Sequence, residues 1–198
     1  MGKLAFNETV RNASLPLLLP IVKILAYLGI HPNIITITCF AGFIISSIFI
    51  AYGELLFGGI FLFLFAPLDA IDGLLARYSK KVTPFGAFLD SVLDRYGEIF
   101  LFLAFTYYFL IQNSFVGVIL SFLAITGSLM VSYTRARAEG VGFECKVGIL
   151  TRFERVTLLI IALIFDVCIP ILVFIALFTH ITALQRIMHV YRIYKTGG

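Results

Sequence analysis

The sequence predicts an all-α integral membrane protein with six transmembrane helices and an N-terminal amphipathic helix at the membrane interface. Hydrophobic residues make up 61% of the 198-residue chain and charged residues only 13%, and the mean hydropathy is +1.04. Soluble domains average about 45–50% and about 25% for the same two classes. Because so few charged side chains cannot cover a soluble surface, lipid must be the solvent for most of the chain. Each span needs roughly 20 apolar residues, so the length allows about six spans.

The N-terminal segment is apolar but interrupted. Residues 7–30 contain Pro16, Pro20 and Lys23, which disfavour a spanning helix and favour an amphipathic helix lying at the interface. We therefore divide the chain into a juxtamembrane segment, residues 1–30, and a six-helix membrane domain, residues 31–198.

Six apolar stretches follow, separated by short polar or glycine-containing breaks. The first begins after Pro32, the second ends near Arg77, and the third ends before Gln112. The weakest boundary lies between the last two, where only Asp166 and Pro170 indicate a turn. The predicted spans are residues 33–52, 54–77, 84–111, 115–137, 154–170 and 171–192.

Lysine and arginine predict the orientation, because they collect in the short cytoplasmic loops of membrane proteins. The turns at residues 53–54, 112–114 and 166–170 contain neither residue, whereas the alternate connections and the C-terminal stretch are basic. An even number of spans with both termini cytoplasmic satisfies this pattern. We therefore expect a multi-pass protein of the plasma membrane.

Four aspartates lie within or at the ends of the second and third spans. Asp69 and Asp72 are three residues apart, Asp90 and Asp94 are four apart, and each pair therefore shares a helix face. The short turn over residues 78–85 makes the two helices antiparallel neighbours and brings the pairs together. Ionised carboxylates are costly in hydrocarbon, so this cluster requires cations or water.

Oxygen ligands without histidine or cysteine nearby favour magnesium, manganese or calcium. Four carboxylates suit two ions better than one, and two divalent ions are the usual arrangement for displacement at phosphorus. Gly73 and Gly86 would let a ligand approach the backbone closely, and Arg77 suits a phosphate. The alternative is a set of helix-end charges satisfied by Arg77, Arg95 and water.

The run Asp69-x-x-Asp72-Gly73-x-x-Ala76-Arg77, eight residues, Gly86-x-x-x-Asp90-x-x-x-Asp94 resembles the signature of the CDP-alcohol phosphotransferase family at every fixed position. The resemblance implies a six-helix membrane fold, a homodimer, and two magnesium or manganese ions. It also implies displacement of CMP from a CDP-linked alcohol by the hydroxyl of a second alcohol.

The same resemblance implies roles for single residues. Asp69, Asp72, Asp90 and Asp94 match metal ligands, and Asp94 also matches the general base. The positions that match contacts to the CDP-lipid are Gly73, Arg77, Thr83, Pro32, Asn33 and Thr36. For the segment around Asn33 an equal alternative is a plain helix start with Asn33 as the N-cap.

A second cluster of charged residues bears on the acceptor. The run Ser132-Tyr133-x-Arg135-Ala136-Arg137-Ala138-Glu139 resembles the phosphatidylinositol-phosphate and archaetidylinositol-phosphate synthase branch, as do Arg152-x-Glu154-Arg155 and Thr182-x-x-Gln185-Arg186. That resemblance implies inositol 1-phosphate as the acceptor. The residues expected to bind its phosphate are Arg135, Arg155, Arg186 and Arg152.

Several alternatives stay open at this stage. Some of the cations belong to an ordinary positive-inside loop, and glycerol 3-phosphate would also suit converging arginines. The lipid donor can be CDP-diacylglycerol or CDP-archaeol, and a soluble CDP-inositol donor is less favoured. A cation transporter would also use intramembrane aspartates, but would not need Gly73 or Arg77. No nucleic-acid partner is expected.

Overall fold

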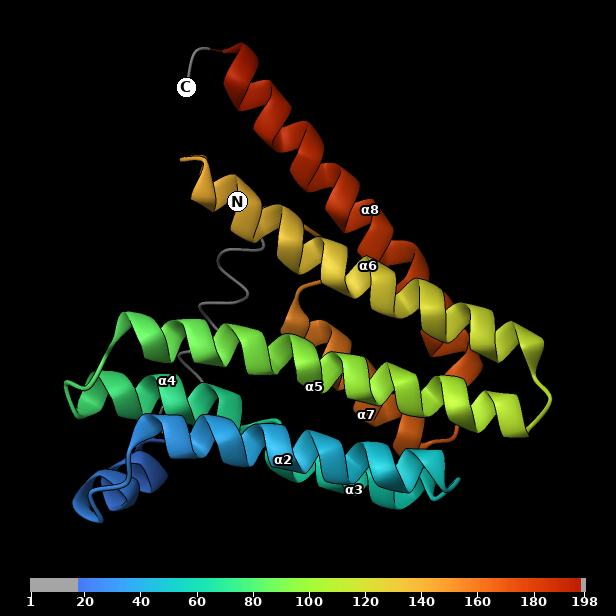
Figure 1. The fold of residues 1–198 in the computed structure, drawn as a ribbon, viewed down its shortest axis with the longest axis horizontal. Coiled ribbons are helices and arrows are strands. Elements are labelled where there is room, and N and C mark those ends of the chain that lie inside the picture. Colours follow the sequence, from blue (N-terminus) through green and yellow to red (C-terminus); the bar gives the residue numbers. More distant parts are fainter. Residues whose placement is uncertain (1–17, 197–198) are drawn as a thin grey trace.

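The computed structural model describes residues 18–196, and this part of the chain forms helices and turns without any strand (Figure 1). A first helix covers Leu18–Tyr27. The helices after it are α2 (Pro32–Ala51), α3 (Leu55–Phe65), α4 (Leu68–Tyr78), α5 (Pro84–Ile111), α6 (Phe115–Gly140), α7 (Arg152–Ile164) and α8 (Cys168–Lys195).

Two helices begin at a proline that follows a capping side chain. The N-cap of α2 is His31, whose Nδ1 accepts a hydrogen bond from the Asn33 amide at 3.3 Å. The alternative of Asn33 as N-cap is therefore wrong. Thr83 caps α5, and its hydroxyl oxygen accepts from the Gly86 amide at 3.0 Å. Proline suits these first positions because its missing N–H would have no helical partner there.

The second predicted span is one apolar segment but two helices. The chain turns at Ala66 and Pro67, and α4 begins at Leu68. Proline lacks the amide hydrogen needed to continue α3. The break separates the apolar α3 from α4, which carries Asp69 and Asp72.

The boundary between the last two spans differs from the prediction. The turn comprises residues 165–167, with Asp166 at φ 52°, and Pro170 lies inside the first turn of α8. A helix's first turn tolerates proline, so Pro170 did not mark the break. As a result α7 has only 13 residues, about 20 Å in length, against about 30 Å of hydrocarbon.

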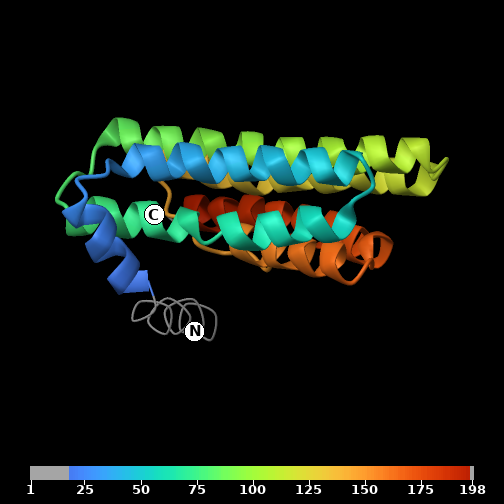
Figure 2. The same cartoon turned by 90° about the horizontal axis from the view of Figure 1, so that it is seen from below.

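The helices form a closed ring in which each segment packs against two neighbours. Its order is α2, α5, α6, α8, α7 and α3, with α4 packed against α2. Figure 2 shows the same arrangement from below. Large buried side chains from different helices, including Phe43, Phe102, Phe105, Leu159 and Leu172, fill the interior of the ring.

Four segments of the described chain are long and apolar enough to cross a membrane: α2, α3 with α4, α6 and α8. The protein is therefore an all-helical, multi-pass membrane protein. The count of six spans stays a prediction, because α7 is short and the first half of α5 is rich in charge.

The N-terminal helix partly matches the expected interfacial segment. Val22 is buried against Ile35, Ile71 and Leu75, whereas Tyr27 and its apolar neighbours on the other face are exposed. Residues 7–17 of the predicted segment lie outside the described residues. Its placement at an interface and the division at residue 30 stay predictions.

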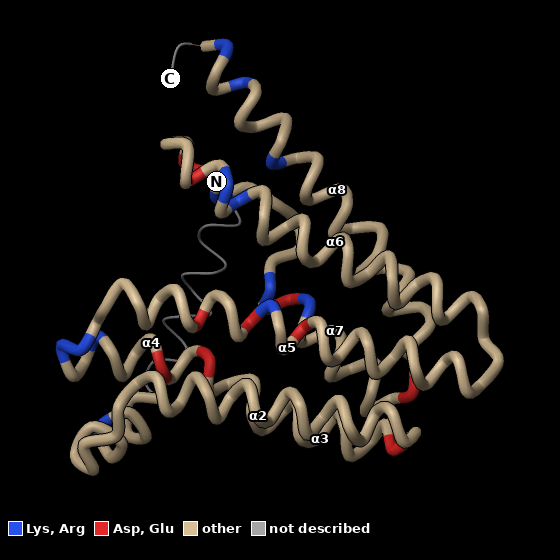
Figure 3. Tube along the Cα trace, in the orientation of Figure 1, with Lys and Arg blue, Asp and Glu red and all other residues tan. Residues whose placement is uncertain are grey.

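Charged residues are distributed unevenly along the bundle (Figure 3). Lysine and arginine gather at the α4–α5 connection and in the C-terminal parts of α6 and α8. The turns at the opposite end carry Glu54 and Asp166. This asymmetry is the one that predicted the orientation, which the structure itself does not test.

Candidate active site

The four aspartates of the sequence motif come together between α4 and α5. Asp69, Asp90 and Asp94 each have a carboxylate oxygen within 4.8 Å of the others. Asp72 lines the same small pocket as these three and Arg152. The α4–α5 turn thus brings the two pairs face to face, as their spacing predicted.

Asp72 and Asp90 have very different surroundings. Asp72 is buried, and its Oδ2 accepts a hydrogen bond from the Thr36 hydroxyl of α2 at 2.7 Å. The Oδ1 of Asp90 is buried without a hydrogen-bond partner among the described residues. A buried carboxylate oxygen that no donor satisfies fits a hard divalent cation, for which oxygen ligands are preferred.

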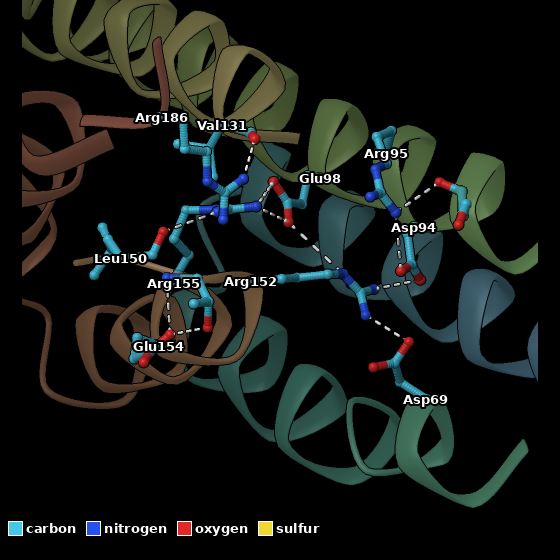
Figure 4. A network of polar contacts seen from close by, with 12 residues as sticks. Asp69, Asp94, Arg95, Glu98, Val131, Leu150, Arg152, Glu154, Arg155 and Arg186 are labelled. Carbon is cyan, nitrogen blue, oxygen red and sulfur yellow. Dashed lines mark hydrogen bonds and ion pairs between the residues drawn. The ribbon is translucent and has the colours of Figure 1, made fainter. Parts of the chain in front are cut away.

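Arginine side chains enter the cluster from α5 and α7 (Figure 4). One terminal nitrogen of Arg152 forms an ion pair with Asp69 at 2.5 Å, and the other forms an ion pair with Asp94 at 2.8 Å. Arg95 contacts the other oxygen of Asp94 at 3.3 Å. Asp94 is therefore held between two guanidinium groups, and Arg152 lies at the carboxylates rather than in a loop facing solvent.

The sequence prediction missed one charged residue of this network. Glu98 is buried, and both of its oxygens accept from Arg155 of α7, at 2.8 and 3.0 Å. The spacing of Asp90, Asp94 and Glu98, four residues apart along α5, was the signal that could have revealed it.

These residues carry an excess of negative charge. The five carboxylates of the network and its three guanidinium groups leave a formal charge of −2. The acidic side chains are Asp69, Asp72, Asp90, Asp94 and Glu98, and the basic ones are Arg95, Arg152 and Arg155. The donor chemistry and the charge balance both suit bound cations.

A cavity of about 320 Å³ lies next to the carboxylates. Asp72 and Asp90 form part of its wall, so it is continuous with the cluster. All six positions predicted to contact the CDP-lipid also line it: Pro32, Asn33, Thr36, Gly73, Arg77 and Thr83.

Two glycines keep this cavity and its rim open. A Cβ on Gly73 would have only the Arg77 guanidinium nearby, at 3.6 to 3.9 Å, so the cavity side of Gly73 is free. A Cβ on Gly86 would lie 3.0 Å from the Thr83 hydroxyl and 3.2 Å from the Asn33 side chain. Glycine at residue 86 therefore lets α5 begin close to α2.

The four arginines predicted to bind the acceptor do not share one environment. Arg135 is exposed and paired with Glu139 at 2.8 Å, whereas Arg155 is buried on Glu98. Arg186 is buried and donates to the carbonyls of Val147 and Val131. It lies close enough to Arg135 and Arg155 to interact electrostatically with both. Arg152 is the one that contacts the aspartates.

The described residues thus form a helical membrane bundle with a carboxylate cluster beside a cavity. The sequence matches the CDP-alcohol phosphatidyltransferase family over residues 29–190, most of its length. The chain belongs to this family and is a transferase of phospholipid biosynthesis. A cation transporter is thereby set aside.

Several named relatives match most of the chain. It is 37% identical over 166 residues to the archaetidylinositol phosphate synthase of Pyrococcus horikoshii, covering 83% of this chain and 86% of that protein. It is 35% identical over 155 residues to the protein of that name from Methanothermobacter thermautotrophicus, covering 78% and 77%. It is 31% identical over 208 residues to the phosphatidylinositol phosphate synthase of Streptomyces avermitilis, covering 97% and 85%.

Solved structures share the fold. The phosphatidylinositol phosphate synthase of Mycobacterium tuberculosis with CDP-DAG bound has a TM-score of 0.79 and 25% identity, covering 87% of this chain and 92% of that one. The same enzyme in complex with manganese and citrate gives a TM-score of 0.79 and 25% identity, covering 87% and 88%.

Proposed function

We propose that this enzyme transfers a phosphatidyl-type group from a CDP-lipid to inositol 1-phosphate and releases CMP. The observation that most directly supports this function is the cavity of about 320 Å³, which joins the predicted CDP-binding residues to the aspartate cluster. The names of the relatives support the inositol phosphate acceptor, and the CDP-DAG complex of the structural relative supports the donor.

The cavity walls suit the headgroup of the donor. Arg77 offers a guanidinium for phosphate oxygens, and the bare backbone at Gly73 leaves room for close approach. Thr83 and Asn33 supply polar groups near the rim. The lipid tails would lie among the exposed apolar side chains outside the ring, where CDP-diacylglycerol and CDP-archaeol are not distinguished.

Asp69, Asp72, Asp90 and Asp94 would hold two magnesium or manganese ions. Such ions polarise the phosphoryl oxygens and stabilise the charge of the leaving CMP. Two divalent cations would change the formal charge of the network from −2 to +2, which offsets the two negative charges of the pyrophosphate. The manganese complex of the structural relative supports this choice of ion.

Asp94 is the proposed general base, which accepts the proton of the acceptor hydroxyl as that oxygen attacks the β-phosphorus. Contacts from Arg95 and Arg152 fix both carboxylate oxygens of Asp94. Arg152 also brings a positive charge to the place where the acceptor phosphate would approach. Arg135 and Arg186 are proposed to contribute positive charge further along the same path, whereas Arg155, which is buried against Glu98, is proposed to act only through Glu98.

The cellular context is part of the proposal. The basic end of the bundle would face the cytoplasm at the plasma membrane, which places the active site where a soluble phosphate acceptor is available. A homodimer is proposed from the family resemblance.

The test is an acceptor panel. Purified protein with magnesium and a CDP-lipid is given inositol 1-phosphate, glycerol 3-phosphate, inositol or serine, and CMP release is measured. We expect release with inositol 1-phosphate and its loss on chelation of the metal with EDTA. Release of CMP with glycerol 3-phosphate alone would exclude inositol 1-phosphate as the acceptor, but the enzyme would still be a CDP-alcohol phosphotransferase.

A further inference from the structure

We propose that Glu98 is a positioning residue, which holds Arg152 beside Asp94 so that Arg152 can bind the phosphate of the acceptor. The inference rests on the proposed function, because the acceptor is taken to carry a phosphate group. Glu98 itself does not contact the substrate in this arrangement.

Glu98 lies on α5 one helical turn beyond Asp94, deeper in the bundle. It is only 3% exposed, although it is a carboxylate within an apolar interior. A buried carboxylate is tolerated only with strong compensation. Arg155 provides this compensation through one nitrogen that donates to both oxygens of Glu98.

The Arg155 side chain is itself fixed. It is 1% exposed, and its second terminal nitrogen points to the Leu150 carbonyl at 3.4 Å. Arg155 therefore cannot reach a substrate from its present position. Its contact with Glu98 instead attaches the first turn of α7 to α5.

Arg152 lies one turn before Arg155 on α7 and reaches the other side of Glu98. Its Nε is 3.7 Å from a Glu98 oxygen, while its terminal nitrogens contact Asp69 and Asp94. The guanidinium also lies over the Phe43 ring, 5.6 Å from its centre. Figure 4 shows Glu98 between the two arginines.

The contact between Arg155 and Glu98 is important because α7 has few other contacts with α5. Along its length α7 packs mainly against α3 and α8. Charged side chains therefore carry much of the connection between the start of α7 and α5. Loss of the Glu98 charge would leave Arg155 buried without its partner and release the Nε side of Arg152.

The first experiment compares Glu98→Gln with Glu144→Gln, in full-length protein with magnesium. Glu144 is exposed in the α6–α7 connection and paired with Lys146, so this control removes an equivalent charge away from the site. We expect Glu98→Gln to raise the KM for the acceptor roughly tenfold or more. The KM for the CDP-lipid should change less than about twofold, and the control should match the wild type.

A second variant tests whether Glu98 positions Arg152 or only stabilises the fold. Glu98→Leu combined with Arg155→Met replaces the buried pair by apolar side chains, which preserves or raises stability in comparable cases. Glu98→Gln should lower the Tm, because it leaves Arg155 buried without its partner. The double variant should have the Tm of the wild type, while its KM for the acceptor stays raised. Recovery of both the Tm and the acceptor KM would overturn the proposal, because Glu98 would then only support the fold.

A binding measurement adds a readout that does not depend on turnover. In wild-type protein the acceptor should raise the Tm in a concentration-dependent way, and the double variant should need roughly tenfold more acceptor for the same shift. An unchanged shift would contradict the proposal. All measurements use whichever phosphate acceptor the wild type accepts, so a failure of the inositol 1-phosphate assignment remains distinguishable from a failure of this inference.

Discussion

The four aspartates are chemically identical, but three of them have clearly different surroundings. Asp72 accepts a hydrogen bond from Thr36, Asp94 lies between Arg95 and Arg152, and Asp90 keeps one buried oxygen without a protein donor. The four carboxylates are therefore not equivalent in their contacts or burial. The sequence spacing predicted that these residues meet, but not these differences.

Substitution of Asp94 by asparagine tests the general base. Asparagine keeps the size of the side chain but cannot accept the proton, so we expect kcat to fall by roughly 10²-fold or more. Binding of the CDP-lipid should stay close to the wild-type value. CMP release and lipid binding, measured on purified protein, check the two parts separately.

Asp166→Asn is the matched control, because Asp166 is exposed at the opposite end of the bundle. Its turnover should equal that of the wild type. Normal turnover of Asp94→Asn would eliminate Asp94 as the base.

Substitution of Gly73 by alanine tests the cavity as the donor site. The added methyl group meets only the end of Arg77 and should improve helix propensity, so the Tm should be unchanged or higher. Because the methyl group would occupy space in the cavity, we expect the KM for the CDP-lipid to rise roughly tenfold. Steady-state kinetics and a thermal melt provide the measurements.

Gly140→Ala is the control for this substitution, since a Cβ there has no atom within 4 Å. It should leave the KM for the CDP-lipid unchanged. A Gly73→Ala protein with wild-type kinetics would show that the donor headgroup binds elsewhere.

Among the elements, helices with a local start signal were predicted well. The predicted range 84–111 coincides with α5, because Thr83 and Pro84 form a cap that can be read from neighbouring residues. The break at Pro67 was missed because the residues before it are uniformly apolar and no polar residue lies directly beside it. The end of α7 was wrong because Pro170 fits a first turn as well as a break.

In the candidate site, too, features set by neighbouring residues were predicted and features set by distant residues were not. The motif predicted the aspartates and the lining of the cavity, because each pair depends on residues within one helix turn. Glu98 and Arg155 are 57 residues apart, and no local pattern connects them. Which arginine reaches the aspartates depends on how α7 is placed, and the sequence did not determine that.

The whole molecule presents a basic end and an end whose turns lack lysine and arginine, and this predicts its orientation. The native thiols of Cys39, Cys145 and Cys168 are buried, so single added cysteines can be labelled in cells. We expect a membrane-impermeant maleimide to label Gln112→Cys in intact cells, and Lys80→Cys only after permeabilisation. The reverse pattern would place the active site on the outer side of the membrane.

The shortness of α7 has a consequence for the ring as a whole. At about 20 Å, this helix is about 10 Å shorter than the hydrocarbon layer, and the non-helical residues 141–151 continue the chain at its Arg152 end. In the predicted six-span arrangement, a bilayer beside such a helix would have to thin, or water would have to reach its end. The proposed reaction joins one reactant dissolved in lipid to another dissolved in water. In that arrangement, the short helix would let both lipid and water come close to Arg152 and Asp94.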